Sequence, residues 1–216
     1  MNKAVIFDLD GVIVDTAKYH YKAWQNVAKV LGFQFTKEQN ETLKGVSRVK
    51  SLDILIGLSG KTISNKEKEA LLISKNEEYL ISVAEMQADE ILDGIVEVLD
   101  YLDENKIKYA LGSASKNAPL ILKKVGLFDR FIAIVDGNDV SKAKPNPEVF
   151  LIAAKKLDLN PENCIVIEDA VAGVTAANAA NMLSIGIGEQ DILSHADIIL
   201  KDTSRLTIKL LNSIFF

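Results

Sequence analysis

The chain contains 216 residues, of which 48% are hydrophobic and 25% are charged, and its formal net charge at pH 7 is −5. This composition is typical of a globular protein with enough chain for one large domain or for a core and a smaller domain. The acidic balance argues against a general nucleic-acid-binding or anionic-membrane-binding protein, but it does not exclude a phosphorylated small-molecule ligand, which responds to local charge.

The first predicted element is a β-strand at residues 5–7, an apolar run that indicates burial on both faces of a parallel sheet. Its carboxyl end carries Asp8 and Asp10. Because ligands of open α/β sheets bind beyond the carboxyl ends of the strands, this strand end is the first candidate reaction centre.

The next segment, residues 16–88, shows helical periodicity and no strand signal. Gly32 stands where the C-terminal cap of its first helix is expected. The predicted helices are residues 16–32, 37–57 and 66–82, divided by Gly45 and by a turn-rich stretch at residues 57–65.

From residue 93 onward, helices and strands alternate. The predicted helices are residues 93–105, 118–125, 147–157 and 171–181, and the predicted strands are residues 107–111, 131–135, 164–167, 183–187 and 198–200. This alternation predicts an α/β fold with a doubly wound parallel sheet and helices on both faces. Since the first strand belongs to the same sheet, the sequence predicts a core of residues 1–15 and 93–216, an inserted helical domain at 16–88 and a hinge at 89–92.

The single cysteine, Cys164, excludes an intrachain disulfide and is consistent with a reducing compartment. It opens an apolar strand, where we expect a core position without a catalytic role. No signal peptide precedes the first strand, and no apolar run approaches the ~18 residues of a membrane span. We therefore expect a cytoplasmic protein.

Four polar clusters each follow a predicted strand or introduce the next helix. They are Asp8 with Asp10, residues 113–117, Lys144 with Pro145, and Glu168 with Asp169. The carboxyl ends of parallel strands meet at one edge of a sheet, so we expect these clusters to face the same crevice.

Together the clusters predict phosphoryl transfer. Asp8 is placed to attack a phosphate and form an aspartyl-phosphate, and Asp10 is placed to move a proton to or from the reacting oxygen. Glu168 and Asp169, with an oxygen of Asp8, offer the hard ligands that Mg²⁺ prefers. Lys144 would add a positive charge near the phosphate.

Each cluster taken alone has a simpler explanation. An Asp-x-Asp sequence is commonly a turn or a solvated pair, and an isolated lysine such as Lys144 is commonly at the surface. Ser113 and Asn117 could cap the next helix, and for Asn117 capping is the favoured role. A Glu-Asp pair also suits a helix N-terminus. Only the combination, in this order and at strand ends, indicates a shared active site.

The same residues carry a resemblance to the haloacid dehalogenase superfamily. The matching motifs are Asp8-Leu9-Asp10-Gly11-Val12-x-x-Asp15-Thr16, Ser113, Lys144-Pro145 and Glu168-Asp169. The resemblance spans the whole chain and implies a Rossmann-like core with a small α-helical cap. Residues 15–24, 43–48 and 113–117 are also similar to the β-phosphoglucomutases of this superfamily, which implies interconversion of β-glucose 1-phosphate and glucose 6-phosphate through the 1,6-bisphosphate.

The resemblance also implies a set of site residues. Substrate or phosphate contacts would come from Thr16, His20, Gly45, Val46, Ser47, Arg48, Lys75, Asn76, Ser113, Ala114, Ser115, Lys116, Asn117 and Lys144, and Mg²⁺ ligands from Asp8, Asp10, Glu168 and Asp169. Arg48 would bind the phosphate that is not being transferred, because a guanidinium binds phosphate bidentately.

Several residues keep two interpretations. His20 is either a packed or surface histidine or a group that positions Asp10 or the sugar. Lys75 and Asn76 lie in a predicted helix, where such residues are usually solvated, although the resemblance places them near substrate. Trp24 is expected in the core of the cap.

The sequence also leaves two alternative functions open, a phosphatase and a binding protein. A phosphatase of the same superfamily, acting on a sugar phosphate or phosphoglycolate, shares the aspartyl-phosphate chemistry and differs only in using water as the acceptor. A catalytically silent binding protein on this fold is opposed by the complete set of carboxylates and lysine. We expect a monomer that binds a sugar phosphate and neither nucleic acid nor a membrane.

Overall fold

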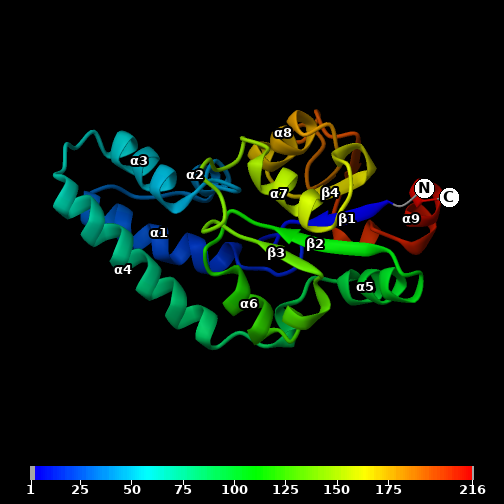
Figure 1. Cartoon of the computed structure of the whole chain (residues 1–216). Coiled ribbons are helices and arrows are strands. Elements are labelled where there is room, and N and C mark those ends of the chain that lie inside the picture. Colours follow the sequence, from blue (N-terminus) through cyan, green and yellow to red (C-terminus); the bar gives the residue numbers. More distant parts are fainter. Residues whose placement is uncertain (1–2, 216) are drawn as a thin grey trace.

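The computed structural model describes residues 3–215. Its six strands form one sheet in the order β3-β2-β1-β4-β5-β6, and every neighbouring pair is parallel. The strands are β1 (Ala4–Phe7), β2 (Lys108–Gly112), β3 (Ala133–Val135), β4 (Cys164–Glu168), β5 (Leu183–Ile187) and β6 (Ile198–Leu200). The first strand of the chain therefore lies at the centre of the sheet, as Figure 1 shows.

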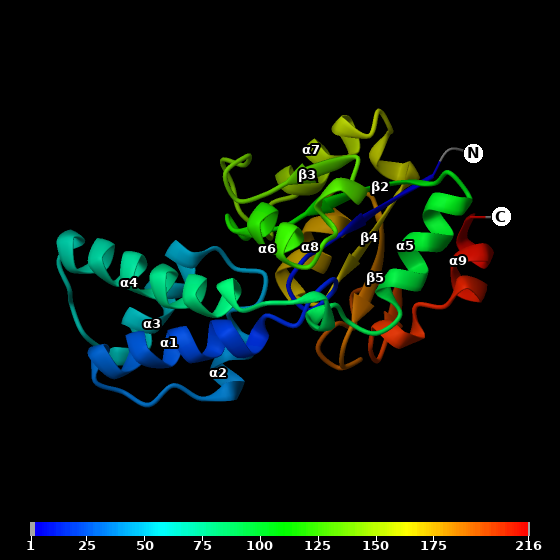
Figure 2. The same cartoon turned by 90° about the horizontal axis from the view of Figure 1, so that it is seen from below.

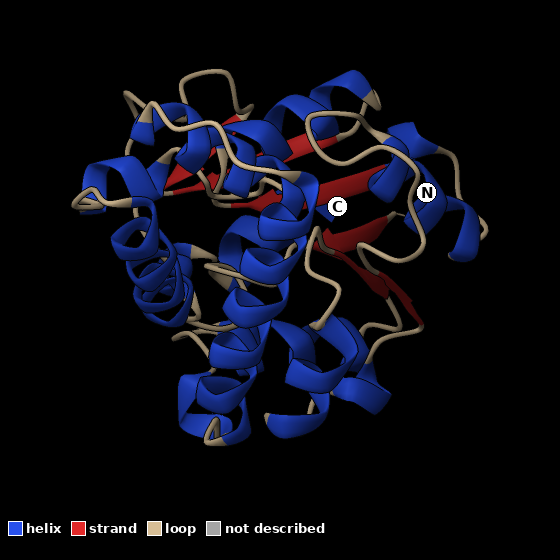
Figure 3. Ribbon diagram, turned by 90° about the vertical axis from the view of Figure 1, so that its left-hand side faces the viewer, coloured by secondary structure: helices blue, strands red, loops and turns tan. Residues whose placement is uncertain are grey.

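Helices cover both faces of this sheet (Figure 3). The helices are α5 (Ile95–Glu104), α6 (Ala118–Lys124) and α9 (Ile208–Phe215) on one face, and α7 (Glu148–Lys156) and α8 (Val171–Ala179) on the other. Alternate residues of β1 point to the two layers: Val5 and Phe7 pack with the first group, and Ala4 and Ile6 with the second. All four are fully buried, which confirms the predicted doubly wound α/β fold.

Four helices between β1 and α5 form a separate bundle, which we call the cap. They are α1 (Ala17–Leu31), α2 (Lys37–Glu41), α3 (Arg48–Ser59) and α4 (Asn65–Ala84). The bundle has its own apolar core, in which Trp24 lies as predicted. Figures 1 and 2 show α1 and α4 running side by side, with the other two helices beyond them and the sheet to one side.

The two chain crossings between the cap and the core are paired with each other. Val14 and Ile91 form an antiparallel bridge, and the N–H of Asp15 donates to the carbonyl of Glu90 at 3.1 Å. The Glu90 side chain also accepts from Lys18 at the start of α1. These contacts hold the two crossings together at one place.

The helix boundaries differ from the predictions at a few points. Gly32 ends α1 in the left-handed conformation, as expected, but α3 runs past Gly57 to residue 59 because Gly60 is the glycine that turns left-handed. Helix α9 was not predicted. The remaining connections contain the short 3₁₀ turns Ala88–Glu90, Phe128–Arg130, Pro161–Asn163 and Thr203–Arg205. Across residues 3–215, no helix is both long and apolar enough to cross a membrane.

Candidate active site

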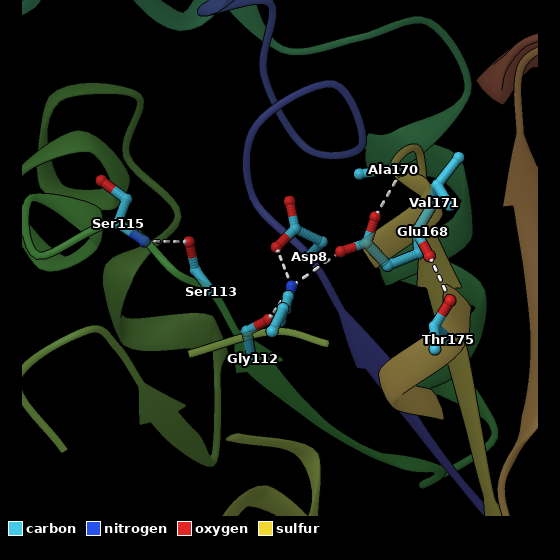
Figure 4. Close-up of polar contacts among 9 residues, drawn as sticks. Asp8, Gly112, Ser113, Ser115, Glu168, Ala170, Val171 and Thr175 are labelled. Carbon is cyan, nitrogen blue, oxygen red and sulfur yellow. Dashed lines mark hydrogen bonds and ion pairs between the residues drawn. The ribbon is translucent and has the colours of Figure 1, made fainter. Parts of the chain in front are cut away.

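The polar clusters at the ends of β1, β2 and β4 lie together (Figure 4). The N–H of Asp8 donates to the carbonyl of Ile167 at 2.9 Å, which extends the pairing of β1 with β4 by one residue. This bond places the Asp8 carboxylate beside Glu168, while Ser113 follows β2 on the other side of β1. The sheet register therefore brings these clusters to one edge, as the sequence predicts.

Lys144 connects two of these clusters. Its Nζ lies 2.6 Å from Asp8 Oδ1, 2.7 Å from Glu168 Oε1 and 3.0 Å from the carbonyl oxygen of Gly112. The side chain is buried, so the alternative of a surface lysine is wrong. All three ammonium protons have acceptors, which holds the charge at one fixed point beside the nucleophile candidate.

The charges of this group depend on one another. Burial and the carboxylates of Glu168 and Asp10 raise the pKa of Asp8, and the Lys144 ammonium opposes that rise. Burial works against the Lys144 charge, but Asp8 and Glu168 outweigh it and raise the pKa of Lys144. A carboxylate nucleophile must be ionised, so Asp8 needs this cation and gains from any further positive charge nearby.

Three carboxylates could supply that further charge by binding a metal ion. Oxygen atoms of Asp8, Glu168 and Asp169 lie within 4.8 Å of one another. Burial and the Glu168 carboxylate raise the pKa of Asp169 to about 7, against the opposing charge of Lys44, as expected when like charges share a buried site. The left-handed Gly11 passes so close to the Asp169 carboxylate that a side chain there would collide with it. Hard oxygen donors in a buried cluster fit a divalent cation such as Mg²⁺.

The Asp10 carboxylate, which the sequence also placed among the metal ligands, is not in this group. Its Oδ1 accepts from the hydroxyl of Thr16 and lies 3.7 Å from His20 Nε2. Burial opposes ionisation, but hydrogen bonding to His20 and Thr16 and the nearby charge of Lys75 lower the pKa of Asp10. The Asp10 carboxylate faces the cap crossing, where it suits proton transfer, and a part for Asp10 in the metal site stays a prediction.

Thr16 was expected to contact substrate and is placed differently. The side chain is fully buried and does not line the cavity, and its hydroxyl donates to Asp10. Thr16 precedes α1, so the chain enters the cap at the residue that holds the proton-transfer group. Thr16 therefore contacts Asp10 directly, and a contact between Thr16 and the substrate stays a prediction.

His20 and Lys75 form a pair behind Asp10. Lys75 Nζ lies 2.8 Å from His20 Nδ1, and Lys75 is only 2% exposed, so of its two interpretations the solvated one is wrong. Burial and Lys75 lower the pKa of His20, and burial and Arg48 lower the pKa of Lys75 to about 7. We assign Nδ1 of a neutral His20 as the acceptor from Lys75, which leaves its Nε2–H facing Asp10.

A cavity of about 420 Å³ lies between the core and the cap. Of the residues expected at the site, those that line it are Asp8, Asp10, His20, Gly45, Val46, Ser47, Arg48, Lys75, Ala114, Ser115, Lys116, Asn117 and Asp169. Thr16, Asn76, Ser113, Lys144 and Glu168 lie behind this lining. Core and cap both contribute, so the cavity is an interdomain site of the kind that binds small ligands.

The loop after β2 forms the core side of the cavity. Ser113 Oγ accepts from the N–H of Ser115 at 3.0 Å, and Ser115 Oγ accepts from the N–H of Asn117 at 3.3 Å. The Asn117 side chain does not cap α6, contrary to the favoured prediction. Its Nδ2 instead donates to Oδ1 of Asn76 on α4 at 3.0 Å, so this amide joins core to cap.

The cap side carries the loop before α3. Ser47 caps α3 by accepting from the N–H of Lys50, and Arg48 begins that helix with its guanidinium half-buried at the cavity. Gly45 touches the core, because a Cβ on it would lie 2.8 Å from the Cβ of Ala170. A larger residue at this position would push the cap away from the helix that follows Glu168.

Among the cavity residues to which the sequence analysis assigned no role are Ser51 and Lys44. Ser51 is buried one helical turn after Ser47, a spacing that could have indicated it. Lys44 reaches from the cap to the core, with its Nζ 3.4 Å from Asp169 Oδ2 and 2.8 Å from Glu41 Oε2. Nothing in the local pattern distinguishes Lys44 from a surface lysine, because its partner at Asp169 is 125 residues away in the chain (169 minus 44).

Removing the Lys44 charge should strengthen metal binding. The Lys44 ammonium lies 3.4 Å from the Asp169 carboxylate, and their Coulomb attraction is about 1 kcal/mol even at the dielectric constant of water. A metal ion that binds Asp169 has to compete with this attraction. Lys44→Met should therefore lower the Mg²⁺ dissociation constant by roughly fivefold, measured by isothermal titration calorimetry. Lys61→Met, at an exposed cap position, is the control and should leave the constant unchanged. Weaker binding in Lys44→Met would contradict this electrostatic competition.

The comparisons with known proteins agree with this geometry. The family described as haloacid dehalogenase-like hydrolase matches residues 2–181. A β-phosphoglucomutase of Bacillus subtilis is 42% identical over 97% of this chain and 94% of its own. The crystal structure of a β-phosphoglucomutase from Clostridium difficile, also 42% identical, superposes with a TM-score of 0.94 over 99% of this chain and 96% of the other. A fructose-1-phosphate phosphatase of Escherichia coli is 31% identical over 85% of this chain and 95% of its own.

Proposed function

This chain belongs to the haloacid dehalogenase-like hydrolase family, and we propose that it is a Mg²⁺-dependent β-phosphoglucomutase. The reaction interconverts β-glucose 1-phosphate and glucose 6-phosphate through β-glucose 1,6-bisphosphate. One observation carries the proposal: the cavity has a nucleophile candidate, Asp8, on its core side and a guanidinium, that of Arg48, on its cap side. A mutase must hold two phosphates at once, whereas a phosphatase needs to hold only one.

The proposed cycle starts with Asp8 phosphorylated. The 6-hydroxyl of β-glucose 1-phosphate attacks this phosphoryl group while Asp10 takes the hydroxyl proton. The bisphosphate then turns over in the site, so that its 1-phosphate faces Asp8 and its 6-phosphate faces Arg48. Asp8 attacks the 1-phosphate, Asp10 returns the proton to the leaving oxygen, and glucose 6-phosphate departs from a rephosphorylated enzyme.

The surrounding residues support each step of this cycle. Lys144 keeps Asp8 ionised and is fixed by three acceptors. The Thr16 hydroxyl donates to Asp10, and His20 Nε2 lies 3.7 Å from the same carboxylate. Bound Mg²⁺ at Asp8, Glu168 and Asp169 would neutralise part of the phosphoryl charge. Closure of the cap about its paired crossings would exclude water from the aspartyl-phosphate.

A small-molecule phosphatase is the second candidate, because relatives such as the fructose-1-phosphate phosphatase share most of the chain length. Product analysis separates the two. Incubation with β-glucose 1-phosphate, Mg²⁺ and a trace of the bisphosphate should yield glucose 6-phosphate with little free phosphate. Release of one phosphate for each substrate consumed would refute the mutase and establish the phosphatase.

Replacing Arg48 with Ala should separate mutase turnover from simple hydrolysis. A bidentate charge-assisted contact to the resting phosphate contributes roughly 1.5–3 kcal/mol, so kcat/KM for β-glucose 1-phosphate should fall by about 10- to 100-fold. Hydrolysis of acetyl phosphate, which has no second phosphate, should change less than threefold. Arg205→Ala, at an exposed position, serves as the control for removal of an arginine. Equal losses in both reactions would contradict a second phosphate site at Arg48.

We also propose that the enzyme works as a cytoplasmic monomer on a free sugar phosphate, without a nucleic-acid or membrane partner. Every group that has a role in the cycle comes from one chain, so the cavity needs no second copy to complete it. The net charge of −5 opposes binding to anionic polymers and surfaces. The buried Cys164 thiol fits a reducing compartment.

A further inference from the structure

Tyr79 on α4 contains an unexplained polar atom. Its side chain is fully buried, and among the described residues its hydroxyl is the buried side-chain oxygen or nitrogen that has no hydrogen-bond partner. A buried hydroxyl without a partner destabilises a fold, and a phenylalanine would fill the same space without that cost. The stability of the cap therefore does not explain why this position carries a tyrosine and not a phenylalanine.

The ring of Tyr79 holds two groups that surround the proton-transfer carboxylate. It stacks on the imidazole of His20, with ring centroids 4.2 Å apart and planes inclined by 30°. The Nζ of Lys75 lies 4.5 Å from the centre of the same ring, within cation–π distance. His20 Nε2 is 3.7 Å from Asp10. The stacked Tyr79 ring therefore sets the orientation in which the His20 imidazole faces the Asp10 carboxylate.

The Tyr79 hydroxyl lies near Asp10 and Thr16. Burial and the charge of Asp10 raise the pKa of Tyr79, whereas hydrogen bonding to the Thr16 hydroxyl lowers it. The two hydroxyls therefore lie within reach of each other, although their present geometry falls short of a formed hydrogen bond. Tyr79 is consequently neutral and has a proton to donate. Thr16 donates its own proton to Asp10, so the Thr16 oxygen retains lone pairs that can accept another hydrogen bond.

We propose that Tyr79 is a positioning residue for Asp10. Its ring holds His20 and Lys75 in place, and in the substrate-loaded enzyme its hydroxyl donates to Thr16 Oγ1, which completes a hydrogen-bonded chain from Tyr79 through Thr16 to Asp10. Each bond in such a chain polarises and strengthens the next, so the added donor holds the carboxylate more firmly toward the sugar. The inference rests on the proposed function, in that Asp10 moves the proton.

Tyr79→Phe tests the hydroxyl without removing the ring. Its Tm should be equal to or above that of the wild type, because an unpaired buried hydroxyl is lost. Its kcat with β-glucose 1-phosphate should fall about tenfold, the loss expected for one hydrogen bond made in the transition state, while KM changes less than twofold. Tyr21→Phe removes another cap hydroxyl, one that is 3.4 Å from the carbonyl of Phe35, and should leave kcat unchanged.

Tyr79→Leu tests the ring through a readout that does not need turnover. The chain has two histidines, and His195→Gln identifies which imidazole resonances in an NMR spectrum belong to His20. Loss of the stacked ring should shift the His20 resonances in Tyr79→Leu, while Tyr79→Phe should keep them within the wild-type range. Unshifted His20 resonances in Tyr79→Leu would overturn the role of the ring.

Failure of this inference can be told from failure of the proposed function. If the wild type hydrolyses phosphate esters but makes no glucose 6-phosphate, the mutase proposal fails. The Tyr79→Phe variant is then compared with the wild type by the kcat of hydrolysis, because Asp10 would activate the attacking water in that reaction. A Tyr79→Phe variant whose kcat is within twofold of the wild type overturns the role of the hydroxyl in either reaction.

Discussion

Replacing Asp8 with Asn should reduce turnover by at least about 10⁴-fold, because an amide cannot form the acyl phosphate through which the phosphoryl group passes. The variant keeps the size of the side chain and the backbone bond from residue 8 to Ile167. Intact-mass spectrometry after brief incubation with acetyl phosphate should show one added phosphoryl group in the wild type and none in Asp8→Asn.

An Asp93→Asn variant provides the matched control, because it makes the same chemical change at an exposed position just before α5. It should turn over and become phosphorylated as the wild type does. Retained turnover in Asp8→Asn, or a phosphoryl group that still appears on that variant, would show that the nucleophile is another residue.

Replacing Lys144 with Met should damage both stability and activity. Removing one partner of a buried ion pair costs about 3–5 kcal/mol, because the remaining charges are left without compensation. Here the uncompensated groups would be Asp8 and Glu168, each less than 3 Å from the lost ammonium. The pKa of Asp8 would then rise further, so less of the carboxylate would be ionised and turnover at neutral pH should fall by at least about 100-fold.

Urea unfolding and steady-state kinetics measure these two effects. Lys142→Met is the control, because it removes an exposed lysine from the same loop and should change neither measurement appreciably. Added Mg²⁺ should restore part of the stability of Lys144→Met, since the metal site shares Asp8 and Glu168 with the lysine. Full activity in Lys144→Met would contradict a charge-compensating role.

The core half of the site was predictable because it depends on local spacing and one rule of topology. Asp8, Ser113 and Glu168 each follow a short apolar run, and parallel strands bring their ends to the same edge. Neither step requires knowledge of side-chain packing. The same reasoning correctly placed the helical segment as an insertion between β1 and α5.

The cap half was harder to predict because its contacts depend on packing between segments that are distant in the chain, both within the cap and between the cap and the core. Asn117 is a plausible helix cap by sequence, yet its amide bonds Asn76 across the domain boundary. Lys75 looks like a solvated helix residue until α1 covers it with His20. Lys44 and Tyr79 gain their partners in the same way, through packing between segments that are distant in the chain.

The central claim is that the phosphoryl group passes from Asp8 to a second hydroxyl of the sugar, and single-turnover label transfer tests it most directly. Enzyme phosphorylated on Asp8 with unlabelled phosphate is mixed with an equal amount of β-glucose 1-phosphate carrying a ³²P label, with Mg²⁺ present. The account predicts unlabelled glucose 6-phosphate and a label on Asp8, with no reaction of the α-anomer. Label released as free phosphate, or label found in glucose 6-phosphate, would contradict it.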